Sequence, residues 1–554
     1  MSFLQLVRRG MRGSLRKLVF MSGIGGISSA AILAAINAGA QSADTSHKPS
    51  LWAVALFVIS LFLFIKTQTY VTTTVTAEIE AIIHRLRVRL MDDVRHAELL
   101  AIEALGRSRI FAAITSDAAV LTQASNTLCY SMQSVVVVFF VAGYVAYLSF
   151  AAFVLSVVII AAAGAMFHFR GKRLTAERSR AAEQERRLFD RLTDFLDGFK
   201  EVRLNASRSA DLFNDSVAVS RVAANIKIGA QVETFRQIVS TQSYMYILLG
   251  AVVFVAPIFS SSFAGESITQ TTTALLFVVG AAFGLVQSIP ILSNANAAAD
   301  RLEKLDSDLH AATSQERGQI QAASGFDRIE MRGIEFSYKD RFSETAFRIG
   351  PIDFTVQSGE LVFITGGNGS GKSTFMRVLA GLYPPASGTT TLDGMRITAA
   401  TRNQYRALIS TVFTDYHLFH RLYGISDPDP AEVDRLLRQF RLIDKTDMSG
   451  GEFRTLDLSD GQRKRLALIV ALLEKRPILL LDEWTADQDP EFRRKFYHEL
   501  LPQLVRGGAT VVAITHDERY LDELTVPARR IRMDEGRIAE EQRLGPGSPS
   551  TENG

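Results

Sequence analysis

A long run without a charged residue, from Ala118 to Phe169, is the feature that most constrains how this chain can fold. As a single helix it would extend to more than twice the hydrocarbon thickness of a bilayer, which is about 30 Å. We therefore predict that it crosses a membrane twice, as two helices, with a turn near Leu148, Ser149 and Phe150.

Two further parts of the chain have the same character. The stretch from Gln237 to Ala299 holds one charged residue, Glu266, inside a polar patch that predicts an outer turn. Near the N-terminus, apolar runs at about Leu18–Ala40 and Leu51–Val71 flank a polar link. Three hairpins of this kind predict six membrane-spanning helices.

Basic residues predict the orientation of these helices. Arg8 and Arg9 precede the first span, and Arg170 follows the fourth, whereas the three predicted outer turns contain only one basic residue, Lys48. An excess of Lys and Arg marks the cytoplasmic side, so both termini are expected there. The Arg-rich start also resembles a mitochondrial presequence, but the spanning run that follows at once favours an interfacial entry helix.

Composition excludes some classes of function. The 554-residue chain is 47% hydrophobic, and its net charge of +3 comes from 61 basic and 58 acidic residues. This near-balance argues against a nucleic-acid partner bound by bulk charge. The single cysteine, Cys129, excludes an intrachain disulfide and a cysteine-based metal site.

Charged, helix-like segments lie between the second and third spans and between the fourth and fifth. Each is interrupted by a glycine, Gly106 in the first and Gly198 in the second, at which a long helix can turn. We predict short crosswise helices at these two positions, able to touch another domain.

The chain divides into a helical part and a soluble part. We predict a transmembrane domain over 1–315, an α/β domain over 324–540 and a disordered tail over 541–554, with a polar connector between the domains.

The soluble part contains a phosphate-binding motif in the context that this motif requires. The run Gly366–Thr374 follows a buried-strand segment and precedes a helix, so its backbone N–H groups point at anionic oxygens. Lys372 would reach the β- and γ-phosphates of ATP, and the Ser373 hydroxyl would ligate Mg²⁺. The residues predicted to cradle the nucleotide are Gly366, Asn368, Gly369, Ser370, Gly371, Lys372, Ser373 and Thr374.

Two later strands end in residues suited to phosphate chemistry. A hydrophobic strand ends at Asp482 and Glu483, where Asp482 could hold Mg²⁺ and Glu483 could polarise the attacking water. The strand from Thr510 to Thr515 ends at His516, which is predicted to lie by the γ-phosphate. Parallel strands deliver such ends to one crevice. Lys372, Glu483 and His516 are therefore the candidate catalytic residues.

The segment Ser459–Gln462, ahead of a helix, resembles the signature sequence of ATP-binding cassette (ABC) proteins. Together with the phosphate loop and Tyr338, placed to stack on adenine, it makes the chain similar to an ABC exporter with a fused six-helix membrane domain. The resemblance implies a dimer in which each ATP lies between the phosphate loop of one subunit and Ser459, Gly461 and Gln462 of the other. It also implies that the breaks at Gly106 and Gly198 are coupling helices.

Local departures narrow the resemblance. Thr414 stands where most cassettes have a glutamine, so Thr414 and Asp415 join Ser373 and Asp482 as candidate Mg²⁺ contacts. The string from Trp484 to Phe492 is similar to the cyclic peptide exporter family, which includes exporters of syringomycin-type lipopeptides and of the pyoverdine precursor. The resemblance implies a bacterial inner-membrane ATPase.

The predicted function is therefore ATP-driven export of a peptide, cyclic or nonribosomal, or of a siderophore precursor, from cytoplasm to periplasm. ATP would favour the closed dimer and hydrolysis would release it. A lipid flippase or multidrug exporter of the same fold, and an ATPase serving as a sensor or assembly partner, remain alternatives. Polar and aromatic residues within the spans are candidates for the substrate cavity, with interhelical hydrogen bonds or interfacial anchoring as the alternative: Gln133, Tyr144, Gln242, Tyr244, Tyr246 and Gln287.

Overall fold

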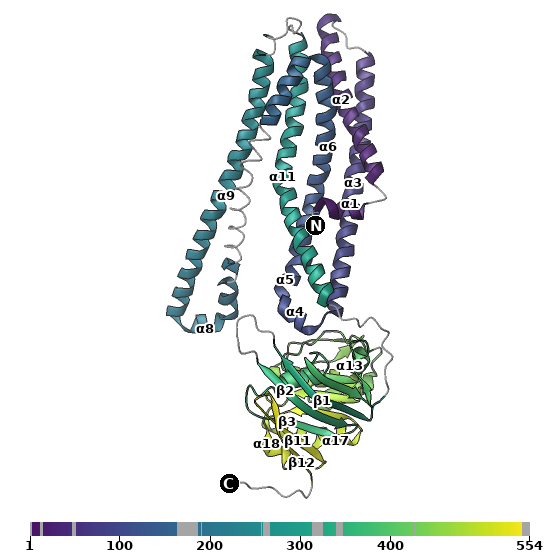
Figure 1. The fold of residues 1–554 in the computed structure, drawn as a ribbon, viewed down its shortest axis with the longest axis vertical. Coiled ribbons are helices and arrows are strands. Elements are labelled where there is room, and N and C mark those ends of the chain that lie inside the picture. The colour runs from purple at the N-terminus through teal and green to yellow at the C-terminus, as the bar shows by residue number, and fades with distance from the viewer. Residues whose placement is uncertain are drawn as a thin grey trace. The chain divides into compact units, whose positions relative to one another are not determined.

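The computed structural model describes residues 3–11, 15–46, 51–162, 187–189, 191–255, 258, 266–312, 325–338, 347–425 and 427–545. The chain forms two compact units, and each is considered by itself (Figure 1). Unit 1 contains Met1–Met91 and Ser108–Ser307, and unit 2 contains Asp92–Arg107 and Asp308–Gly554. The soluble unit thus includes a short segment taken from between two long helices.

Long helices build unit 1. They are α2 (Leu15–Ser46), α3 (Leu51–His96), α6 (Ala118–Leu148), α9 (Ala206–Phe254) and α11 (Glu266–Ala312), preceded by the short α1 (Phe3–Gly10). Among the described residues, five helices are long and apolar enough to cross a membrane. Of the fourth predicted span, the structure describes the apolar helix Phe150–Ala162, and the remainder lies outside the described residues.

The predicted turn between the third and fourth spans is confirmed. Helix α6 ends at Leu148, and Ser149 has an extended backbone with φ −158° and ψ 112°. The Ser149 hydroxyl then accepts a hydrogen bond from the Ala152 amide at 3.3 Å, which caps the next helix.

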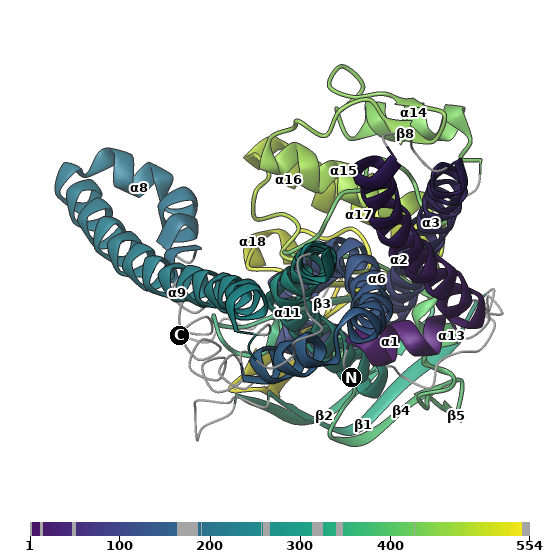
Figure 2. The same ribbon diagram turned by 90° about the horizontal axis from the view of Figure 1, so that it is seen from above.

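A shared apolar core joins the helices of unit 1. It includes Leu33 of α2, Val141 of α6, Leu248 of α9 and Leu275 of α11, all nearly inaccessible to solvent. Helices α2 and α6 approach each other closely at Gly26, where an added Cβ would lie 2.2 Å from a methyl carbon of Val136. Small residues allow such close packing of apolar helices. Seen from above, α9 and α8 (Phe199–Leu204) extend away from α2, α3 and α6 (Figure 2).

Both glycine breaks produce short helices, as predicted. Helix α4 (Leu99–Leu105) ends at Gly106, whose φ of +80° suits glycine, and is followed by α5 (Arg107–Ala112) and a π-helical turn, Ala113–Asp117. Helix α8 begins after Gly198 and precedes the long helix α9 (Figure 1).

Unit 2 contains two main sheets. The larger has the strand order β12-β11-β3-β10-β9-β6, in which β11, β3, β10, β9 and β6 run parallel. The smaller is antiparallel, with the order β2-β1-β4-β5. The strand bounds are β1 Arg328–Ser337, β2 Arg348–Gln357, β3 Leu361–Thr365, β4 Ser387–Leu392, β5 Met395–Arg396, β6 Ile409–Val412, β7 Met448–Ser449, β8 Glu452–Phe453, β9 Ile478–Asp482, β10 Thr510–Ile514, β11 Ala528–Asp534 and β12 Arg537–Leu544.

Helices flank the larger sheet. They are α12 Lys372–Leu379, α13 Arg402–Arg406, α14 Pro430–Gln439, α15 Asp460–Leu473, α16 Pro490–Lys495, α17 Leu501–Arg506 and α18 Glu518–Leu521, with a π-helical turn at Phe496–Leu500. One prediction is corrected at the end of the chain. Residues 541–544, assigned to a disordered tail, pair with β11 as part of β12. Backbone pairing with a neighbouring strand outweighs the polar composition that suggested a tail.

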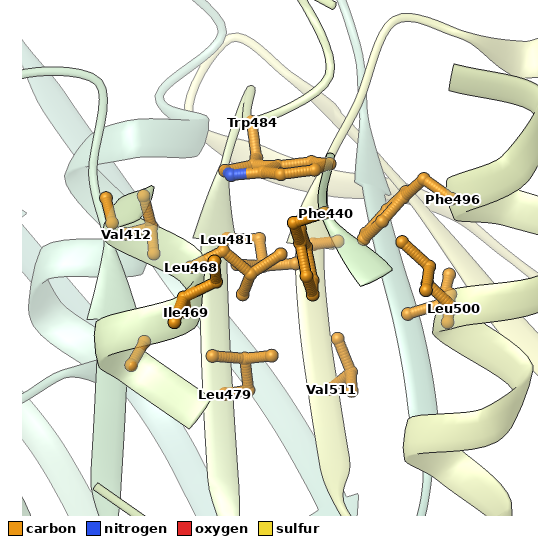
Figure 3. Packing of buried hydrophobic residues seen from close by; sticks show 14 of the residues in the cluster. Val412, Phe440, Leu468, Ile469, Leu479, Leu481, Trp484, Phe496, Leu500 and Val511 are labelled. Atoms are coloured by element: carbon orange, nitrogen blue, oxygen red, sulfur yellow. The ribbon is translucent and has the colours of Figure 1, made fainter. Parts of the chain in front are cut away.

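Both faces of the larger sheet are buried. Leu479 and Leu481 of β9 face a core around Trp484 and Phe440 (Figure 3). The intervening Leu480 belongs to a second core on the opposite face. Continuous hydrophobic strands are what a parallel sheet covered on both faces requires. This packing fixes the strands, and with them the polar residues at their C-terminal ends.

Candidate functional site

The glycine-rich loop joins β3 to α12, as its sequence predicted. Gly366, Gly369 and Gly371 have φ values of 140°, 78° and 96°, which side chains with a Cβ rarely adopt. Space is also limiting, because a Cβ at Gly366 would lie 2.2 Å from the Met533 carbonyl oxygen. The loop is therefore a tight backbone cradle at a helix N-terminus, an arrangement that binds anions.

Lys372 is folded back onto this loop. Its Nζ donates to the carbonyl oxygens of Gly366 at 3.0 Å and Gly367 at 2.9 Å, and the residue is only 5% exposed. Burial lowers the pKa of the ammonium group, and the nearby carboxylates Glu483 and Asp482 oppose that change. A phosphate placed in the loop would supply the negative charge that this buried cation lacks.

Ser373 and Asp482 meet at the mouth of the loop. The Ser373 hydroxyl donates to Asp482 Oδ1 at 3.1 Å, which joins the first turn of α12 to the end of β9. Asp482 is 1% exposed, and its Oδ2 has no hydrogen-bond partner among the residues that the structure describes. Burial raises the pKa of this carboxyl. A hydroxyl beside an unsatisfied carboxylate oxygen fits a hard cation such as Mg²⁺.

Strand pairing brings Glu483 and His516 together. Ile514 of β10 lies opposite Asp482 of β9, so the residues that follow each strand are neighbours. His516 Nε2 lies 3.1 Å from Glu483 Oε1. Glu483 has a φ of +48°, and its amide donates to the Ile514 carbonyl at 3.2 Å, so the backbone fixes where this carboxylate emerges.

Thr414 and Asp415 follow β6, which pairs with β9. Both residues are exposed, and Asp415 Oδ2 accepts a hydrogen bond from Arg377 Nη2 at 3.1 Å. The structure therefore pairs Asp415 with an arginine of α12, although the topology places the loop at the same sheet edge as Asp482.

Tyr338 follows β1 and is half-buried. Its ring packs edge-on against Phe336, with centroids 5.2 Å apart, and against Tyr383 at 5.9 Å. The residue predicted to stack on adenine thus lies in an aromatic cluster of the soluble unit.

The Ser459–Gln462 segment starts α15. The Ser459 hydroxyl accepts from the Gln462 amide at 3.4 Å, and Gln462 Oε1 accepts from the Ser459 amide at 3.1 Å, which forms a capping box. Asp460 occupies the first turn, where a carboxylate suits the helix dipole. A Cβ on Gly461 would lie 2.5 Å from the Asp487 carbonyl oxygen, so glycine is required there.

Sequence reasoning missed two buried cations beside this segment. Lys464 is 6% exposed and contacts Asp487 at 2.5 Å and the Glu483 carbonyl oxygen at 3.1 Å. Arg465 pairs with Asp489 at 2.6 Å. The run of three basic residues here was the available signal, but only tertiary structure shows that two of them are buried against the loop after Glu483.

Comparison with known proteins identifies the family. Residues 349–486 match the family described as ABC transporter. Over 93% of its length, the chain is 33% identical to the ATP-binding protein SyrD of Pseudomonas syringae pv. syringae, and the match covers 92% of SyrD. The chain belongs to the ABC transporter family. Over 38% of its length, the chain is also 32% identical to the spermidine/putrescine import ATP-binding protein PotA of Haemophilus influenzae, and the match covers 57% of PotA.

The fold of this ABC transporter matches a solved exporter along almost the whole chain. The structure of a bacterial Atm1-family ABC exporter with ATP bound aligns with a TM-score of 0.77, over 96% of this chain and 95% of the other, at 18% identity. The predicted fold class, a helical membrane domain followed by an α/β cassette, is confirmed. The protein is an ATP-hydrolysing, multi-pass membrane transporter, and its fold is that of the solved exporter.

Proposed function

We propose that this ABC transporter is a homodimeric exporter that moves a cyclic or nonribosomal peptide, or a siderophore precursor, from the cytoplasm to the periplasm. The observation that carries the catalytic part is the convergence of Lys372, Ser373, Asp482, Glu483 and His516 at the C-terminal ends of β3, β9 and β10. The resemblance of the Trp484–Phe492 string to the cyclic peptide exporter family supports the substrate class.

Each residue of this cluster has a separate task in the proposal. Lys372 exchanges the carbonyls of Gly366 and Gly367 for phosphate oxygens. Glu483 orients the attacking water, and His516 holds that carboxylate while its ring faces the γ-phosphate. Tyr338 supports the adenine from the aromatic cluster.

Ser373 and Asp482 are proposed to hold Mg²⁺, which fits the unsatisfied Asp482 Oδ2. When bound, Mg²⁺ neutralises part of the phosphate charge. Thr414 and Asp415 contribute from the neighbouring loop, with Arg377 balancing the Asp415 charge.

In the proposed homodimer, each ATP site is completed by residues of the second copy. Ser459, Gly461 and Gln462 start α15 and are proposed to contact the ATP held by the other subunit. Helix α8 supports the same proposal from unit 1, because Leu204 is 88% exposed and Phe199 is 55% exposed. An exposed apolar pair on a short connecting helix suits burial against another subunit.

Placement in the bacterial inner membrane with both termini cytoplasmic is likewise proposed, from the basic residues that flank the spans. We assign 1–315 to the membrane domain, with α4 docked on the cassette, and 324–540 to the cassette.

The test is ATP-dependent uptake of a labelled cyclic lipopeptide or siderophore precursor into inside-out vesicles, with Glu483→Gln as the matched control. We expect uptake by the wild type, and hydrolysis lowered roughly 100-fold or more in the variant. Movement of labelled phospholipid without peptide uptake would replace the export proposal by a flippase. Wild-type hydrolysis in Glu483→Gln would refute the role of Glu483.

A further inference from the structure

Helix α4 is bound to the cassette by both apolar and charged contacts within unit 2. Leu99 and Leu100 pack against the buried core on one face of the larger sheet. Glu98 Oε1 accepts from Arg402 at 2.6 Å, and its other oxygen lies 3.7 Å from Arg406. These side chains are largely shielded, with 14% of Arg402 and 20% of Glu98 exposed, which strengthens the pairing relative to an open surface.

A second carboxylate of α4 contacts a buried tyrosine. The Tyr383 hydroxyl donates to Glu103, whose oxygens lie 3.0 and 3.2 Å away, and accepts from Arg377 Nη1 at 3.2 Å. Tyr383 is 1% exposed, and burial raises the pKa of its phenol, so the hydroxyl keeps its proton at neutral pH. A hydroxyl that accepts from a cation is a better donor to an anion, so the two bonds reinforce each other.

Arg377 connects this tyrosine to the nucleotide site. It lies on α12 four residues after Ser373, so both side chains occupy the same face of the helix that the phosphate loop begins. Its second terminal nitrogen donates to Asp415 at 3.1 Å. Asp415 follows β6, which runs parallel to β9, so the pair lies at the same sheet edge as Asp482 and the proposed magnesium position.

The guanidinium of Arg377 is therefore shared between two acceptors, one facing the nucleotide site and one facing α4. The Asp415 carboxylate would be attracted to a cation held by Ser373 and Asp482, because the two carry opposite charges. If Asp415 turned toward such a cation, its bond to Arg377 would weaken, and Arg377 would be left with the Tyr383 hydroxyl as its acceptor. Tyr338, which is proposed to support the adenine, packs against the Tyr383 ring. The adenine end of the proposed ATP site therefore also contacts Tyr383.

We propose that Tyr383 is a positioning residue that, with Arg377, Glu103 and Asp415, transmits occupancy of the ATP site to helix α4. The proposal rests on the proposed ATP site at Gly366–Thr374. It adds a connection that starts at the loop following β6 and ends on a helix 280 positions earlier in the sequence than Tyr383.

The experiment follows α4 directly. Ala104 is exposed on this helix and would carry an environment-sensitive fluorophore as Ala104→Cys, in a full-length Cys129→Ala background that removes the single native cysteine. The probe ligand is a non-hydrolysable ATP analogue with Mg²⁺. Binding is measured separately by equilibrium dialysis, and the fluorescence change at saturation reports the state of α4.

Tyr383→Phe keeps the ring and removes the hydroxyl. We expect it to bind the analogue within twofold of the parent while the fluorescence change falls at least fivefold. Glu103→Leu should behave in the same way, and Glu103→Gln, which retains an acceptor oxygen, should keep more than half of the change.

Tyr405→Phe is the matched control, because its hydroxyl bonds to the Leu379 carbonyl in the same core. It should leave the signal intact. An unchanged signal in Tyr383→Phe, an equal loss in Tyr405→Phe, or no ligand-dependent signal in the parent would overturn the proposal. No exported substrate is involved, so a failed export assay leaves this result interpretable.

Discussion

The cassette and the membrane helices differ in how their polar residues are placed. In the cassette, Asp482 at the end of β9 is 1% exposed and accepts from Ser373 of α12, while His516 after β10 contacts Glu483 after β9. In unit 1, Gln242 donates to Tyr246 one turn away on the same helix at 3.2 Å, and Tyr246 is 62% exposed. Tyr144 accepts from Asn37 of a neighbouring helix at 3.3 Å, as the interhelical alternative predicted. The cassette thus brings its polar residues together at one site, whereas these residues of the spans bond in separate pairs.

The largest expected effect concerns Lys372, in the phosphate loop of the cassette. Lys372→Ala removes the buried cation that contacts the phosphate loop, and we expect ATP hydrolysis to fall by about 100-fold or more, because charge stabilisation in a desolvated site is lost. Phosphate release in detergent measures the effect. Lys475→Ala, at an exposed cassette lysine, is the control, and activity above a tenth of wild type in Lys372→Ala would contradict the assignment.

The next effect concerns the exposed end of unit 1. Leu204→Arg places a charge on the exposed surface of α8, and we expect dimer affinity to weaken about tenfold, a loss of roughly 1.4 kcal/mol. Analytical ultracentrifugation in detergent measures association. Met395→Arg, at a residue 70% exposed on the cassette, controls for added charge. Equal association in all three proteins would remove α8 from the proposed interface.

A smaller effect concerns pH. Burial raises the pKa of Asp482 in the folded cassette, so the ionised carboxylate destabilises the fold. This cost builds up as pH rises from the unfolded pKa to the folded pKa and is fully present above the folded pKa. Asp482→Asn should therefore raise the melting temperature of the nucleotide-free protein at pH 7, and its advantage should shrink toward pH 4. Fluorescence of Trp484, in a Trp52→Phe background, follows unfolding, and a pH-independent difference would count against this reasoning.

The smallest expected effect concerns a hydrogen bond between two helices of the membrane domain. Tyr144→Phe removes the bond to Asn37, which is worth about 0.6 kcal/mol for an average interhelical hydrogen bond in a membrane. We expect basal ATP hydrolysis to remain within twofold of wild type. A tenfold loss of hydrolysis, with unchanged thermal stability, would mean that this residue belongs to the transport machinery and not only to helix packing.

The two glycine breaks show what a sequence pattern can and cannot predict. Gly106 and Gly198 predicted short helices equally well, and both exist as α4 and α8. Only the structure distinguishes them, since Glu103 of α4 and its N-cap residue Glu98 contact the cassette, whereas α8 exposes Leu204. The identity of a helix's neighbours depends on residues far away along the chain, which local composition does not encode.

The sequence by itself determined the apolar spans, the phosphate loop and the strand ending at Asp482, because these depend on local hydrophobicity, on glycine and on neighbouring residues. Tertiary structure decided that β10 lies between β3 and β9, which brings His516 to Glu483, and that Tyr383 meets Glu103. It also placed residues 541–544 in a strand and buried Lys464. Strand order and burial arise from the packing of the whole core, so a motif specifies which residues are present while packing specifies which of them meet.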